Sequence, residues 1–107
     1  MALTRDFKIT VLERAQRDSD FRRGLLEEGL ELFLAGDITT GKALIRDYIN
    51  ASIGFEKLAR LTKHKPQSLM RMFSKDGNPR ADNLFAVIKH LQKKEGVQFE
   101  LKTIQTL

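Results

Sequence analysis

Apolar residues recur every three or four positions along most of the chain, which is the spacing of helices that bury one face. This spacing predicts six helices, over about 11–17, 20–36, 41–52, 55–62, 66–75 and 81–95. The segment 20–36 has the clearest stripe, with six large apolar residues: Phe21, Leu25, Leu26, Leu30, Phe33 and Leu34. The pattern therefore predicts a mainly α fold.

Residues typical of helix boundaries lie at the ends of these segments. Thr10 and Glu13 have the spacing of a capping box for the first helix, and Asp18 can cap the second. Gly36 is expected to end the second helix and Gly96 the last, because glycine readily adopts the left-handed conformation found after a helix.

The segment GDITTGKA, at 36–43, resembles a phosphate-binding loop, with two glycines five positions apart and Lys42 after the second. In that motif a serine or threonine follows the lysine and holds Mg²⁺, whereas this chain has Ala43. The segment also follows a periodic helix rather than a buried strand. We therefore expect a helix end, a turn and a new helix capped by Thr39 or Thr40.

The pattern changes near the end of the chain. Val97, Phe99 and Leu101 alternate with polar residues, which predicts a short C-terminal β-strand. Because a strand needs a neighbour for its backbone N–H and C=O groups, we expect one either from the segment of Phe7 and Ile9 or from a second copy of the molecule.

Composition narrows the class of protein. The chain has 107 residues, a formal net charge of +5 and no cysteine, so no disulfide or thiolate metal site is expected. No apolar run is long enough to span a membrane, and the first ten residues lack the apolar core of a secretory signal. These features predict a protein that is cytoplasmic and has no membrane association.

Charge is unevenly distributed along the chain. Residues 1–37 contain six Lys/Arg and eight Asp/Glu, a net charge of −2, whereas residues 38–107 contain thirteen and six, a net charge of +7. Residues 57–80 alone contain seven basic residues and one acidic residue. The basic segment next to an acidic N-terminal segment indicates a polyanion-binding surface and a second surface for another partner. The alternative is that the basic residues form a lysine-rich face exposed only to solvent.

The two short helices over 55–62 and 66–75 are separated by a polar break, and Pro66 suits the first turn of the second one. If Leu69, Met72 and Phe73 face the core, the opposite side presents a polar row: Gln67, Arg71 and Lys75, with Ser68 nearby. Arginine and glutamine have the planar donor groups that recognise guanine and adenine in the major groove. The pair is therefore a candidate helix-turn-helix.

The segment IGFEKLARLTKHKPQSLMRMFSKDGNPRADNLFAVIKHL resembles the five-helix DNA-binding domain of phage-repressor-like (Xre-type, lambda-repressor-like) regulators over about residues 42–92. Leu58-Ala59, Leu69 and Asn78-Pro79 match the family's pattern. SLMRMFSKDGNP and the trailing VQFEL are most similar to addiction-module antidote proteins, the antitoxins of small toxins. Two regions are then expected: an N-terminal helical extension over 1–37, and a helix-turn-helix domain with the C-terminal strand over 38–107.

The resemblance also implies site residues. It implies base contacts from Gln67 and Arg71, phosphate or base-edge contacts from Lys65 and Ser68, and backbone contacts from three others: Lys75, Asn78 and Arg80. Lys63 precedes the second helix, where the chain is expected to approach the phosphate backbone. The chain departs from the family in having Lys63 in place of the usual turn glycine, Phe55 in place of a glutamine and Phe73 in place of a glutamate. A lysine at position 63 is energetically unfavourable if the turn requires the left-handed backbone conformation.

We therefore expect a sequence-specific transcriptional regulator that binds double-stranded DNA as a homodimer. The resemblance implies the antitoxin of a toxin–antitoxin module that represses its own promoter, with a small basic toxin as a possible partner; the alternative is a stand-alone repressor. The carboxylates Glu27, Glu28 and Glu31 are either a solvated face or part of the surface for that partner. No nucleophile, paired acids or metal-ligand spacing is visible, so no enzyme activity, cofactor or metal is expected.

Overall fold

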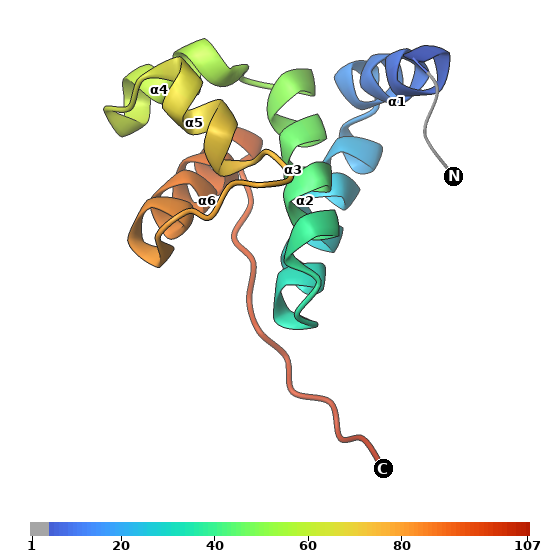
Figure 1. The fold of residues 1–107 in the computed structure, drawn as a ribbon. Coiled ribbons are helices and arrows are strands. Elements are labelled where there is room, and N and C mark those ends of the chain that lie inside the picture. Colours follow the sequence, from blue (N-terminus) through green and yellow to red (C-terminus); the bar gives the residue numbers. More distant parts are fainter. Residues whose placement is uncertain (1–4) are drawn as a thin grey trace.

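Helices dominate residues 5–107, the part of the chain that the computed structural model describes. In chain order they are α1 (Arg5–Arg17), α2 (Ser19–Leu34), α3 (Ile38–Ala51), α4 (Phe55–Thr62), α5 (Pro66–Met72) and α6 (Ala81–Glu95). In Figure 1, α2 and α3 lie side by side, with α1 near one end of this pair and α4, α5 and α6 grouped on its other side. The predicted mainly α fold is confirmed.

Two glycines allow α2 and α3 to pack closely. A Cβ atom added to Gly29 would lie 2.7 Å from a side-chain carbon of Ile45, and one added to Gly41 would lie 2.6 Å from the ring of Phe33. Both distances are too short for real side chains, so glycine is needed at each position. The apolar stripe of α2 is thereby placed directly against α3.

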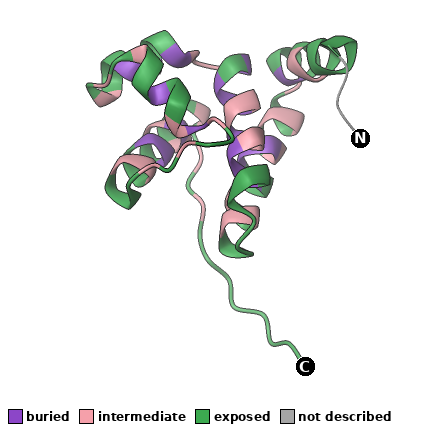
Figure 2. Ribbon diagram, in the orientation of Figure 1, coloured by how far each residue is buried: buried purple, intermediate pink, exposed green. Residues whose placement is uncertain are grey.

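The buried residues form one core that all the helices contribute to. In Figure 2 the buried positions lie where the helices face one another, while the chain after α6 is mostly exposed. The stripe of α2 behaves as predicted for five of its six members, which are buried or half-buried, but Leu34 is 71% exposed. Leu34 lies in the last turn of α2, beyond the reach of the core.

Several predicted helix boundaries are confirmed. Asp18 caps α2, since its Oδ1 accepts a hydrogen bond from the Phe21 N–H at 3.1 Å. Gly36 and Gly96 follow α2 and α6 with φ angles of +89° and +72°, in the left-handed region that glycine adopts at low cost.

Two predicted caps are wrong. Thr10 lies inside α1, where its hydroxyl donates to the backbone carbonyl of Asp6 instead of capping a helix end. Helix α3 is capped by Asp37, whose carboxylate accepts from the Thr40 N–H at 3.2 Å, so Thr39 and Thr40 lie in its first turn. Because α3 begins at Ile38, Asp37 occupies the N-cap position and its carboxylate accepts from a free N–H group of the first turn.

The predicted strand over 97–101 is also wrong for the described residues, which contain no β-strand. Phe7 and Ile9 belong to α1 and supply no strand edge. Phe99 instead packs partly against the core, and its N–H donates to the Gln92 Oε1 at 2.8 Å. Leu101 beyond it is 84% exposed, so the C-terminal tail (residues 97–107) leaves the body after one anchor.

An ion pair at one end of the molecule joins α1, α2, α3 and α6. The guanidinium of Arg22 donates to both carboxylate oxygens of Glu95, at 2.9 and 3.2 Å, and to the backbone carbonyl of Ala15 at 3.0 Å. The hydroxyl of the fully buried Tyr48 donates to the same carboxylate at 2.8 Å. Only 5% of the Glu95 side chain is exposed. Charge-assisted hydrogen bonds of this kind are roughly twice as strong as neutral ones.

This network shifts the pKa values of its members in opposite directions. Burial favours the protonated form of Glu95, but the hydrogen bonds from Arg22 and Tyr48 outweigh it and lower the pKa of the carboxyl below its ordinary value. Burial, together with the hydrogen bond to Glu95, raises the pKa of the Tyr48 hydroxyl. Arg22 is therefore paired with a charged carboxylate throughout the neutral range.

We expect the substitution Glu95→Gln to lower the free energy of unfolding by about 3 kcal/mol at neutral pH, because it leaves the half-buried Arg22 charge unpaired. The pKa of Glu95 is lower in the folded than in the unfolded chain, so its contribution is present above the ordinary glutamate value of 4.5 and is lost as the pH falls below it. Urea unfolding between pH 3 and 7 measures this. Equal acid sensitivity of the wild type and Glu95→Gln would contradict the role of the pair.

Candidate nucleic-acid interface

Helices α4 and α5 are joined by a tight turn of three residues, Lys63, His64 and Lys65. Lys63 has φ 59° and ψ 41°, the left-handed conformation, and is the one described residue other than glycine with a positive φ. The turn therefore requires the left-handed conformation, which glycine adopts at low cost, and a lysine adopts it here. His64 donates its N–H to the Ala59 carbonyl at 2.8 Å, while its ring Nδ1 is buried without a protein hydrogen-bond partner.

The inner side of α5 holds the helix against the core. Leu69 and Phe73 are fully buried, Met72 is half-buried, and the Phe73 ring lies 6.3 Å from the ring of Phe55 at an angle of 55°. This tilted arrangement is favourable for aromatic pairs. Pro66 occupies the first turn of α5, as predicted. Phe55 at the start of α4 and Phe73 at the end of α5 thus join the two helices.

The outer side of α5 and its flanking segments display the predicted site residues. All eight are exposed: Lys63, Lys65, Gln67, Ser68, Arg71, Lys75, Asn78 and Arg80. They lie within 18 consecutive positions, on the turn, on α5 and on the loop before α6. Arg80 pairs with the exposed carboxylate of Asp82 at 3.2 Å. Across residues 5–107, no carboxylate lies within ion-pair distance of Lys63, Lys65, Arg71 or Lys75, so these charges face solvent uncompensated.

The loop that follows α5 is tied to α3 by two cations that the sequence analysis did not assign to this role. Lys42 is only 3% exposed, and its ammonium group donates to the carbonyls of Gly77 at 2.6 Å and Lys75 at 3.4 Å. One helical turn further, Arg46 donates to the carbonyl of Phe73 at 3.0 Å. The signal for Lys42 was present in the sequence, since Lys42 lies on the same face of α3 as Ile45 and Ile49.

Gly77 completes this arrangement. A Cβ atom at this position would lie 1.9 Å from the carbonyl oxygen of Arg71, so only glycine lets the loop fold back on the last turn of α5. The backbone around Lys75 and Asn78 is consequently fixed relative to α5, and the loop and helix present their polar groups as one unit.

The segment GDITTGKA is the predicted helix end, turn and helix start. It contains the end of the turn after α2, the Asp37 cap and the first turn of α3. The ammonium group of Lys42 is directed into backbone carbonyls rather than toward an open loop.

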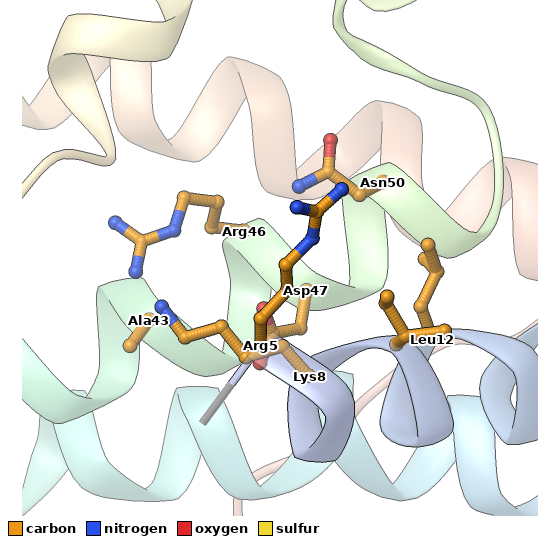
Figure 3. A pocket seen from close by; sticks show the side chains of 8 residues that line it. Arg5, Lys8, Leu12, Ala43, Arg46, Asp47 and Asn50 are labelled. Atoms are coloured by element: carbon orange, nitrogen blue, oxygen red, sulfur yellow. The ribbon is translucent and has the colours of Figure 1, made fainter. Parts of the chain in front are cut away.

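A hollow of about 840 Å³ that is lined by several basic residues lies between α1 and α3 (Figure 3). Arg5 extends across it toward Asn50, Lys8 points toward Ala43, and Arg46 lines its far side. Burial raises the pKa of Asp47 at its base, although Arg46 and Lys8 oppose this effect. The hollow was not predicted from the sequence. Arg46, which lines it, is also the residue that donates to the Phe73 carbonyl at the end of α5.

No group of three or more His, Cys, Asp or Glu side chains in the described part of the chain is placed to hold a metal ion. None of the helices in residues 5–107 combines the length and apolar character needed to cross a bilayer. Comparisons with protein-family models, curated proteins and solved structures give no match to this chain.

We expect Lys63→Gly to raise the free energy of unfolding by about 0.5–1 kcal/mol, because glycine removes the left-handed strain at this turn. Lys65→Gly is the matched control: it also removes a cation, but at φ −77°, where glycine only adds freedom to the unfolded chain. Urea unfolding measures both. A Lys63→Gly variant less stable than the wild type would contradict the strain.

We expect Lys42→Met to lower the free energy of unfolding by about 1–2 kcal/mol, because the loop carbonyls lose their donor. Amide exchange at Gly77, whose N–H donates to the Ser74 carbonyl, should become faster. Lys93→Met, at an exposed position of α6, is the control and should change stability by less than about 0.5 kcal/mol. Unchanged stability and unchanged exchange in Lys42→Met would show that the anchor does not hold the loop.

Proposed function

We propose that this chain is a sequence-specific DNA-binding transcriptional regulator of the helix-turn-helix class that acts in the cytoplasm without a cofactor. The observation that supports this most directly is the division of α5 into two sides. Leu69 on α5 and Phe73 at its end are fully buried, while Gln67 and Arg71 on the helix are exposed. Helix α5 ends at Met72 rather than at the predicted position 75, so Lys75 is exposed on the loop that follows it. A helix with this outward side, fixed from behind and followed by a cation, is suited to the major groove.

The residues divide into two roles on this proposal. Arg71 matches the O6 and N7 of guanine and Gln67 the N6 and N7 of adenine, each pairing being worth about 1–3 kcal/mol of discrimination. Lys65 and Ser68 are assigned contacts to phosphates or base edges, and four further residues contacts to the DNA backbone: Lys63, Lys75, Asn78 and Arg80. The fixed loop after α5 supports this division, because phosphate contacts set the register in which a helix reads bases.

The small size of the reading helix supports a homodimer. Helix α5 has seven residues and can reach only a few base pairs, which is too little to select one site in a genome. Two copies related by a two-fold axis would read a pseudo-palindrome whose half-sites lie about 34 Å apart, one turn of DNA.

Within this class we propose an antitoxin that represses the promoter it shares with a small basic toxin. Exposed carboxylates on α2, those of Glu27, Glu28 and Glu31, favour this over a stand-alone repressor, because they offer an acidic surface on a chain of net charge +5. Co-purification of a basic protein encoded beside the gene would support the antitoxin; a gene without such a neighbour would favour the stand-alone repressor.

We expect Arg71→Ala to reduce discrimination between a binding site selected from random DNA and unselected DNA by about tenfold or more, because each bidentate base contact contributes about 1–3 kcal/mol. Lys75→Ala should instead weaken binding to both DNAs equally and reduce the salt dependence of log K by about one unit. Arg17→Ala, an exposed arginine on α1, is the matched control. Fluorescence anisotropy titrations at several salt concentrations measure all three, and an unchanged ratio in Arg71→Ala would refute the base contact.

A further inference from the structure

A groove of about 390 Å³ runs between α2, α6 and the beginning of the C-terminal tail. Its floor and walls are apolar, and three of its residues are large side chains left mostly in solvent: Leu34 is 71% exposed, Phe85 is 64% and Leu101 is 84%. Phe33, which packs against the core, and the buried Ile88 line the same groove. Exposed apolar side chains that gather around a hollow indicate a surface that is covered in the working molecule.

The rim of this groove is acidic. Glu27 and Glu31 border it from α2 and Glu100 from the tail, and no lysine or arginine is among its lining residues. This local charge is opposite to that of the whole chain, which is +5. An apolar floor with carboxylates along its edges is complementary to a helix that has one apolar face flanked by lysine or arginine side chains.

Two other occupants fit less well. The chain's own tail contributes Leu101 to the lining but leaves that side chain 84% exposed, so the tail does not fill the groove. A second copy that docked face to face through the same groove would bring two sets of three carboxylates together, and like charges at an interface are costly. An anionic lipid surface would meet the same repulsion.

We propose that this groove binds a basic amphipathic helix of a partner protein. The inference deepens the antitoxin form of the proposed function, on which it rests, by naming the surface for the partner: the end of α2, one face of α6 and the start of the tail. The partner helix places apolar residues three and four positions apart over Leu34 and Phe85, and its cations pair with Glu27 and Glu31.

The test uses the full chain and two labelled peptides of about 18 residues, five helical turns, that differ only in charge. The first places leucine on one face and lysine on the other, and the second has glutamate in place of every lysine. Fluorescence anisotropy measures the affinity of each peptide, and sedimentation velocity measures the oligomeric state of the protein under the same conditions.

We expect the lysine peptide to bind about tenfold or more tightly than the glutamate peptide. Leu34→Ser combined with Phe85→Ser should weaken this binding about tenfold or more, since both side chains would lose their apolar contacts with the peptide. Both positions are largely exposed, so the variant should fold.

Leu61→Ser, at a side chain 48% exposed on α4, is the matched control and should bind as the wild type does. Glu27→Lys combined with Glu31→Lys should reverse the preference toward the glutamate peptide.

Equal affinity for the two peptides, or binding that the Leu34/Phe85 variant leaves unchanged, would overturn the proposal. A wild-type dimer that dissociates in the Leu34/Phe85 variant would show that a second copy occupies the groove, and this would also overturn it. DNA discrimination measured on the same variants should stay at the wild-type value. Failure of the peptide test with intact DNA discrimination thus rejects the groove alone, whereas absent DNA discrimination in the wild type rejects the proposed regulator.

Discussion

The pairing of Arg22 with Glu95 holds the end of α6 against α2, which is far away in the sequence. The residues are 73 positions apart, and their two hydrogen bonds are joined by those to the Ala15 carbonyl and from the Tyr48 hydroxyl. A carboxylate that is 95% buried requires this compensation, because an unpaired charge at such a site would be neutralised or would unfold the region. The end of α6 is thereby fixed against α2 and α3, and with it the wall of the groove beside the tail.

Helix α3 transmits this constraint to the candidate interface. Tyr48 joins one side of α3 to the ion pair, while Lys42 and Arg46 hold the loop and the last turn of α5 by their backbone carbonyls. Cations that bond to main-chain carbonyls fix the backbone of that segment without using its side chains. The side chains of Arg71 and Lys75 therefore remain in solvent, available for a ligand.

Features set by neighbouring residues could be predicted from the sequence, and features set by distant ones could not. The apolar faces of α2 and α5 and the exposure of Gln67 and Arg71 depend on helical spacing, and the Asp18 cap depends on a residue three positions away. The Arg22–Glu95 pair and the Lys42 anchor join residues 73, 35 and 33 positions apart, a separation at which no local pattern identifies the partner. The strand over 97–101 failed for the same reason: alternation is local, but a strand also needs a distant partner, and Phe7 and Ile9 belong to α1.

The left-handed Lys63 connects stability with the proposed function. A residue with a Cβ atom costs about 1–2 kcal/mol in this conformation, and glycine would avoid most of that cost. The chain nevertheless has a lysine there, exposed and with no carboxylate at ion-pair distance in the described structure. Strained residues of this kind are concentrated at functional sites. On the DNA-binding proposal the charged side chain of Lys63 contacts a phosphate next to α5, and glycine has no side chain for this contact. The strain at the turn is present with and without DNA, so it lowers the stability of the fold rather than the affinity that the cation adds.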